Sequence, residues 1–380
     1  MKKKIKKSDI ILICIYIIMI ILNAVSWMST SFSDWYALHI LPVWVGIFSP
    51  LTSFLPFSLG YVMITAGVVI IVVGIPAYIA CMIIFRGKRK KVSCISAKIF
   101  LWIMAFIFTT ETLNCFIMYH CSTITDTYFC DSPEKYTTGQ MIDVYQIVAD
   151  ELNTLSVKVP RDSDGKLILT DDLYQTAVSS MKNLTDDYPR LKGFYPKPKK
   201  MIYSGFASQQ YLMGIFLPFS LEVNYNPLME QINYPSTVCH EYAHLKGIMH
   251  EDEAGFISFL ACICSQSNEF QYSGYLSVLS YLEDQIFNSQ LTDADRERAE
   301  KISCSINPEV YCDNYFLSED TWQDVEANAV ISTEVVNKVD STFTDTSLKL
   351  NGVSDGIASY NRKVELLLDY YFERNMLDEH

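Results

Sequence analysis

Three long apolar runs near the N-terminus constrain the fold of this 380-residue chain more than any other feature. They cover residues 9–27, 59–85 and 99–119, and no comparable run follows. Each is close to the roughly 20 residues that a bilayer-spanning helix needs. The first run also exceeds the apolar part of a cleavable signal peptide. The sequence therefore predicts a three-helix anchor in the lipid bilayer at residues 1–120, followed by an outer domain at 121–380.

Lysine and arginine gather in two of the short segments that flank these runs. They cluster at residues 2–7 and 86–91, whereas residues 28–58 contain neither. Basic loops stay on the cytoplasmic side of a membrane. We therefore expect a multi-pass protein of the cell membrane, with its N-terminus in the cytoplasm and an extracytoplasmic domain after the third helix.

The two predicted parts differ in charge. Residues 1–120 hold 11 of the 30 basic residues and 3 of the 43 acidic ones, so the outer domain is strongly acidic. An acidic, solvated domain repels nucleic acid and anionic surfaces. The sequence therefore excludes nucleic acid as a partner.

The outer domain is predicted to be of the α+β class and rich in helix. Apolar periodicity predicts helices with turn residues between them. The helices are expected at about 138–155, 171–184, 235–247, 251–267, 271–287, 292–303, 318–340 and 356–375. Two extended stretches, at 199–207 and 210–226, are expected to form strands.

The segment "TVCHEYAHLKGIMHEDEAGF", residues 237–256, carries the chemistry. His240 and His244 lie four residues apart, so a helix places both imidazoles on one face, where they can bind one zinc ion. Glu241 is turned towards the open side of that ion, where it can act as the base for a bound water. This pattern predicts a zinc-dependent metallopeptidase.

The third metal ligand has three candidates. His250 completes a His-Glu-x-x-His-x-x-Gly-x-x-His pattern that resembles metzincins, although no Met-containing turn follows. Glu251 and Glu253 are the candidates if the segment resembles the second, glutamate-bearing helix of gluzincins. A helix that begins near residue 251 turns these two glutamates to nearly opposite sides. Only one of them can face the ion.

Two longer segments, "GIFLPFSLEVNYNPLMEQINYPSTVCHEYAHLKGIMHEDEAGFISFLAC" and "LKLNGVSDGIASYNRKVELLLDYY", carry a family resemblance. They are similar to an uncharacterised bacterial family of membrane-anchored proteins, the domain of unknown function 3810. The resemblance implies three N-terminal membrane helices, a His-Glu-x-x-His and a Glu-x-Glu-Ala-Asn-Phe segment. It places arginine or serine at the position of His250 in many members, and asparagine where this chain has Gly255. We rank Glu251 first as the third ligand, Glu253 second and His250 third.

Residues outside the motif add two expectations. The stretch "FSLEVNYN", residues 219–226, alternates like a half-exposed strand, and we interpret it as an edge strand that pairs with extended substrate. An ordinary strand with a polar face explains the same alternation. Near the C-terminus, Tyr360 and Arg362 are candidates for stabilising the oxyanion of a tetrahedral intermediate.

Two functions fit these observations. In the first, the chain is a membrane-anchored zinc metallopeptidase with a zincin-like domain of the gluzincin kind that hydrolyses a peptide or protein substrate. In the second, it is a catalytically weak membrane sensor or scaffold that keeps the zincin fold. Glu241 favours the first, because a site that only binds metal has no need of a carboxylate that is not a ligand.

Overall fold

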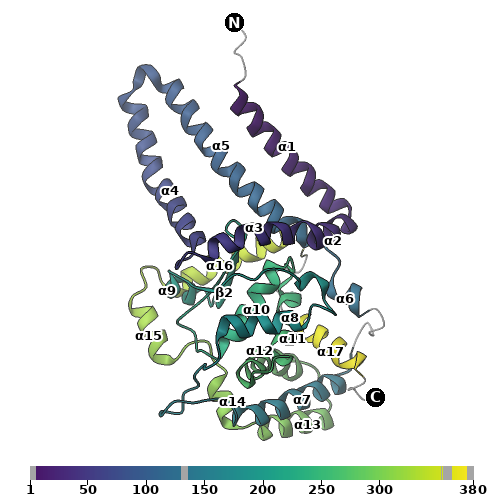
Figure 1. Ribbon diagram of the computed structural model, residues 1–380. Helices are drawn as coiled ribbons and strands as arrows, with labels where there is room; N and C mark the ends of the chain where they lie inside the picture. Colours follow the sequence, from purple (N-terminus) through teal and green to yellow (C-terminus); the bar gives the residue numbers. More distant parts are fainter. Residues whose placement is uncertain (1–5, 130–135, 352, 354–361, 375–380) are drawn as a thin grey trace.

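Three long apolar helices project from one side of a helical domain (Figure 1). The computed structural model describes residues 6–129, 136–351, 353 and 362–374. The projecting helices are α1 (Lys7–Met28), α4 (Leu59–Ile84) and α5 (Arg89–Asn114). Their side chains are largely exposed, as suits a lipid environment. The predictions of a helix-rich fold and of apolar N-terminal helices are confirmed.

The third apolar run differs from its prediction at both ends. Helix α5 begins at Arg89, ten residues earlier than the run, and stops at Asn114, whose side-chain amide donates to the Pro218 carbonyl at 2.8 Å. The following turn of 3₁₀ helix, η2 (Phe116–His120), places Ile117 and Met118 in the domain core. The last apolar residues of the run therefore stabilise the domain.

Residues 28–58 form two helices, where the sequence predicted a connecting loop. Helix α2 (Thr30–His39) begins at the Ser29 cap, and α3 (Leu41–Ser53) follows after a single residue. Together they lie across the domain-side ends of α1, α4 and α5 (Figure 1). By length and apolar composition, four segments of the described chain could cross a membrane: α1, the α2–α3 pair, α4 and the segment around α5.

The centre of the domain is a stack of three helices. These are α10 (Asn233–Leu245), α11 (Glu251–Ile263) and α12 (Asn268–Phe287), and Tyr242, Phe256 and Phe259 are fully buried among them. The remaining helices surround this stack: α6 (Ile124–Tyr128), α7 (Thr138–Ser156), α8 (Leu173–Asn183), α9 (Ser204–Gln209), α13 (Asp293–Ser305), α14 (Pro308–Asp313), α15 (Glu319–Ala327), α16 (Thr333–Leu350) and α17 (Lys363–Glu373). Two further 3₁₀ turns are η1 (Arg86–Lys88) and η3 (Pro189–Leu191).

A small sheet lies between this stack and the α2–α3 pair. Its strands are β1 (Lys199–Lys200), β2 (Gly214–Leu217) and β3 (Glu222–Tyr225), in the order β1-β3-β2 within the described chain. β3 pairs in parallel with β1 and antiparallel with β2. The interpretation of residues 219–226 as an edge strand is therefore wrong: β3 is central and fully buried, and β1 and β2 form the two edges of the described sheet.

Two other sequence expectations need correction. Residues 199–207 were expected to be extended, but only β1 is, because the following residues form α9. The helix expected at 318–340 is two helices, α15 and α16, separated by a break after the Asn328 cap. The expected helix at 356–375 is described only from residue 362 onwards.

A buried carboxylate ties the sheet to the projecting helices. Glu222 of β3 pairs with Lys199 of β1, and both side chains are buried. The same carboxylate accepts hydrogen bonds from the backbone N–H groups of Leu59, at 3.1 Å, and Gly60, at 2.7 Å. These groups form the N-terminus of α4, which favours a negative charge. Glu222 thus fixes α4 to the sheet.

Candidate metal centre

Two consecutive helices bring the motif residues together. Helix α10 has Pro235 in its first turn, and its end is followed by Gly247, whose φ of +82° favours glycine. Only five residues separate α10 from α11, so the chain reverses tightly and the first turn of α11 lies beside the last turns of α10. Glu251, the first residue of α11, therefore faces the histidine-bearing side of α10.

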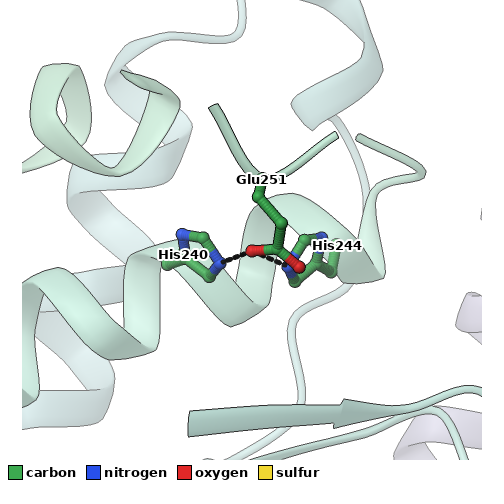
Figure 2. A group of neighbouring side chains, drawn as sticks. All are labelled: His240, His244 and Glu251. Atoms are coloured by element: carbon green, nitrogen blue, oxygen red, sulfur yellow. Dashed lines mark hydrogen bonds and ion pairs between the residues drawn. The ribbon is translucent and has the colours of Figure 1, made fainter. Parts of the chain in front are cut away.

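His240, His244 and Glu251 point towards a common centre (Figure 2). One oxygen of Glu251, Oε2, lies 3.0 Å from Nε2 of His240 and 3.6 Å from Nε2 of His244. The nearest potential ligand atoms of the three side chains all lie within 4.8 Å of one another. The two imidazole rings are nearly perpendicular, with centroids 4.6 Å apart. Such a cluster can surround a single ion.

The spacing of this cluster can be compared with that of a zinc site. Ligand atoms that each lie about 2.0–2.2 Å from a tetrahedral zinc ion are roughly 3.4 Å apart. The two separations between Glu251 and the histidines bracket that value. Nδ1 of His244 lies 2.8 Å from the Ile248 carbonyl. If Nδ1 carries the proton, this bond leaves the Nε2 lone pair directed at the cluster, as in metal-bound histidines. The donor set therefore fits three-ligand zinc with an open fourth position.

The charges of the cluster support one another. Burial by itself raises the pKa of Glu251, but His244 and His240 outweigh burial and hold that pKa well below its usual range. Burial lowers the pKa of His244, but Glu251 and Glu241 outweigh it and raise the pKa to about 9. The carboxylate is thus stabilised by positive charge at this point. A divalent cation would provide the same stabilisation.

Glu241 lies against the sheet and is not a member of the cluster. It is buried, and the backbone N–H of Phe216 in β2 lies near enough to favour its ionised form. A Cβ atom at Gly214 would lie 2.5 Å from Oε1 of Glu241, so β2 can approach the carboxylate closely only with glycine there. Burial raises the pKa of Glu241 to about 8.

The side chains of the cluster and of Glu241 line a cavity of about 600 Å³. His240, Glu241, His244 and Glu251 all line it, together with residues 213–216 in and beside β2. Helix α12 and Lys363, the first residue of α17, form another part of its wall. The site therefore combines possible metal ligands, a separate carboxylate and a strand edge in one hollow large enough for several side chains.

The other candidate residues lie elsewhere. Glu253 accepts a hydrogen bond from the backbone N–H of Ile124 at 2.6 Å, because it is on a different face of α11 from Glu251. His250 precedes α11, and its Nε2 lies 3.3 Å from the Tyr119 carbonyl. Neither of these lower-ranked ligand candidates is part of the cluster.

Of the two oxyanion candidates, only Arg362 is described, and it does not line the cavity. Arg362 pairs with Asp252 at 2.8 Å, and Tyr360 lies outside the described residues. Sequence reasoning missed Lys363, which lines the cavity one position further on. It expected an extended stretch at 210–226 but left β2 out of the site, although a glycine inside such a stretch indicates a close approach of two segments.

The family profile described as "Protein of unknown function (DUF3810)" matches residues 36–368, most of the chain. The chain belongs to the DUF3810 family. This match confirms the family resemblance seen in the sequence. No curated protein and no solved structure matches this DUF3810 protein. The matched region begins inside α2 and ends inside α17, so it contains the whole cluster, β2 and Lys363.

A metal assay on single variants of this DUF3810 protein tests the ligand set. Glu251→Gln should lose zinc, because an amide is a poor ligand and cannot balance the charge of the ion. Glu253→Gln and His250→Ala should keep zinc, since both side chains point away from the cluster. The measurement is zinc content per purified, detergent-solubilised protein. If Glu251→Gln keeps zinc and either of the other two variants loses it, Glu251 is not the third ligand.

Proposed function

We propose that this DUF3810 protein is a membrane-anchored zinc metallopeptidase with a zincin-like, gluzincin-like domain. The observation that carries the proposal is the position of Glu241. It is a buried carboxylate in the same cavity as His240, His244 and Glu251, yet it is held by β2 and is not part of their cluster. Metal binding alone does not require such a group.

The chain's own residues divide the work of hydrolysis. His240, His244 and Glu251 would hold zinc, which when bound polarises a peptide carbonyl and lowers the pKa of a water molecule. Glu241 takes the proton from the attacking water and delivers it to the nitrogen of the leaving amine. The close approach of β2 at Gly214 confines this carboxylate to the cavity while it exchanges the proton.

β2 is suited to orient a peptide substrate. It is one of the two edge strands of the described sheet, and it borders the cavity next to Glu241. An extended peptide can add to such an edge through main-chain hydrogen bonds, which depend little on sequence. The peptide would then run past His240 and Glu241, with one of its carbonyl groups near the cluster.

A catalytically weak sensor or scaffold is the second candidate. It would use the same fold and the same zinc ligands, and the cavity would serve for binding alone. Glu241 again distinguishes the two functions. Burial of a carboxylate that neither binds metal nor forms an ion pair costs free energy, and only a catalytic role explains that cost. We therefore favour the peptidase.

The membrane arrangement follows from the two basic segments. The start of α1 and the turn between α4 and α5 lie at the same end of the projecting helices, away from the domain (Figure 1). Both carry lysine or arginine, at residues 2–7 and 86–91. We propose that this end is cytoplasmic and that the domain is extracytoplasmic, in the cell membrane.

Replacement of the proposed base tests the chemistry. Glu241→Gln should retain zinc but lose peptide hydrolysis by about 10²–10⁴-fold, because the amide keeps the shape and cannot accept a proton. The assay is cleavage of a mixed peptide library by the detergent-solubilised protein, with and without a zinc chelator. Glu253→Gln is the matched control, since this carboxyl is equally buried and faces away from the cavity. A zinc-loaded wild type that cleaves nothing would favour the sensor or scaffold, and full activity in Glu241→Gln would remove its role as base.

A reporter fusion tests the orientation. A reporter that is active only in the cytoplasm, fused after His380, should be silent, because the domain lies outside. A fusion of the same reporter in the turn between α4 and α5 should be active and serves as the control. Strong activity at His380 would reverse the topology.

A further inference from the structure

Lys363 brings a positive charge into the cavity of the metal cluster. It is the first residue of α17 and only 9% exposed, and its side chain forms part of the cavity wall. Nζ donates to the Ser277 carbonyl at 3.0 Å, and the ring centroid of Tyr281 lies 5.2 Å away. Both partners are on α12. The ammonium group is therefore held at a defined place between α12 and the cluster.

This ammonium group has no negative partner in the described part of the chain. Lys363 takes part in none of the ion pairs found there, and its nearest acceptors are the carbonyl and, at 3.5 Å, the hydroxyl of Ser277. A lysine offers three donors, and a buried ammonium normally has a carboxylate to balance it. Burial lowers its pKa to about 8. The position is prepared for an anion from outside the chain.

Because Gly255 has no side chain, the side chain of Lys363 can pack closely against α11 at this position. A Cβ atom at Gly255 would lie 3.1 Å from Cδ and 3.5 Å from Nζ of Lys363. Gly255 is one helical turn after Glu251 on α11, so it lies on the same face as the ligand. The ammonium group thus lies beside α11 about one helical turn after Glu251.

The charges of the cavity also favour an anion. Glu241 and Glu251 together carry two negative charges when ionised, which one divalent cation balances. With that cation bound, the ammonium group of Lys363 gives the cavity a net positive charge. The negative groups that a peptide carries are carboxylates, at its C-terminus or on aspartate and glutamate side chains.

We propose that Lys363 binds a carboxylate of the substrate in the cavity beside the metal cluster. This inference rests on the proposed peptidase function and adds a substrate class to it. A C-terminal carboxylate at this position would make the protein a carboxypeptidase. An internal acidic side chain would make it an endopeptidase with a preference for acidic residues.

The test measures peptide binding instead of cleavage. Zinc-loaded, full-length protein with Glu241→Gln, which binds without turnover, is titrated against three sets of fluorescein-labelled random hexapeptides. One set ends in a free carboxylate, one in a carboxamide, and one in a carboxamide with a fixed internal glutamate. We expect about tenfold or greater preference for one of the two sets with the additional carboxylate over the plain carboxamide set. Lys363→Met should abolish this preference, and Lys363→Arg should keep part of it.

Several results decide the proposal. Equal binding of all three sets, no binding of any set, or an unchanged preference in Lys363→Met would overturn it. If Lys363→Met does not fold, as judged by zinc content and thermal unfolding, Gly255→Ala takes its place. Its methyl group crowds the Lys363 side chain and should weaken the same preference. A carboxylate preference in a protein that cleaves nothing would keep the subsite and refute the peptidase, so the two failures can be told apart.

The α2–α3 pair carries a second, independent inference. Its inner face packs into the domain through Tyr36, Ala37, Leu41 and Val45. Its outer face is apolar and exposed, and residues 28–58 contain no lysine or arginine. The outward side chains are Trp35, Leu38, Val43, Ile47, Phe48 and Leu51.

The position of this outer face indicates what covers it. The pair lies at the domain-side ends of α1, α4 and α5 (Figure 1), and its exposed apolar side chains follow directly along the chain on those of α1 and lead into those of α4. α2 and α3 have 10 and 13 residues, about 15 and 20 Å of helix, whereas the apolar core of a bilayer is about 30 Å thick. Each helix alone is too short to span it, and although the pair together is long enough, one face of the pair is already buried against the domain. We propose that the outer face lies in the lipid headgroup boundary, so that the domain rests on the bilayer surface through this face.

Lipid quenching tests this placement. A tryptophan is added by Leu51→Trp on the outer face, or by Val157→Trp on an exposed part of the domain as the control. Each variant is reconstituted in vesicles of phosphatidylcholine with or without bromine on the acyl chains. Bromine should remove more than half of the added emission at position 51 and none at position 157. Equal emission at position 51 in both lipids, or quenching there that disappears when the protein is diluted within the membrane, would overturn the proposal.

Discussion

The metal cluster and its attachment to η2 and α3 both depend on the close packing around Gly247. Gly247 stands in the turn between α10 and α11, where its positive φ reverses the chain. A Cβ atom there would lie 2.8 Å from Cγ of Met118 and 2.9 Å from Cδ2 of Leu41. The turn that aligns the histidines with Glu251 therefore rests directly on η2 and α3. A larger residue at position 247 would push the turn, and with it the cluster, away from η2 and α3.

The opposite wall of the cavity is anchored in a similar way. Glu222 joins β3 to β1 through Lys199 and to the N-terminus of α4 through two backbone N–H groups. A buried ion pair of this kind adds little net stability, but removal of either partner leaves a buried charge uncompensated. β2 pairs with β3 along its whole length. The strand that approaches Glu241 is thus fixed relative to a helix that projects from the domain.

The sequence was informative where one property dominated a segment. The apolar runs predicted α1 and α4 closely, and the spacing of His240 and His244 placed both on one helical face. It failed for α2 and α3 because α2 mixes polar and apolar residues without a clear helical period, and α3 is largely apolar both towards the core and outward. It also chose the wrong strand as the edge, because polar side chains such as Glu222 and Asn224 suggested exposure and are in fact buried. Lys363 could not be found from sequence, since only the packing of α17 on α11 and α12 brings it to the cavity.

The first turn of α11 resolves the run of acidic residues that the sequence leaves ambiguous. Successive residues of a helix point about 100° apart, so Glu251, Asp252 and Glu253 meet three different surroundings. Glu251 meets the histidines, Asp252 meets Arg362, and Glu253 meets the Ile124 N–H. All three also lie at a helix N-terminus, which stabilises negative charge. One turn of helix therefore ties α10, the start of α17 and the segment after η2 to a common point. A change in the register of α11 by a single residue would exchange these partners and dismantle the cluster, which explains why the ligand and its structural neighbours are adjacent in the chain.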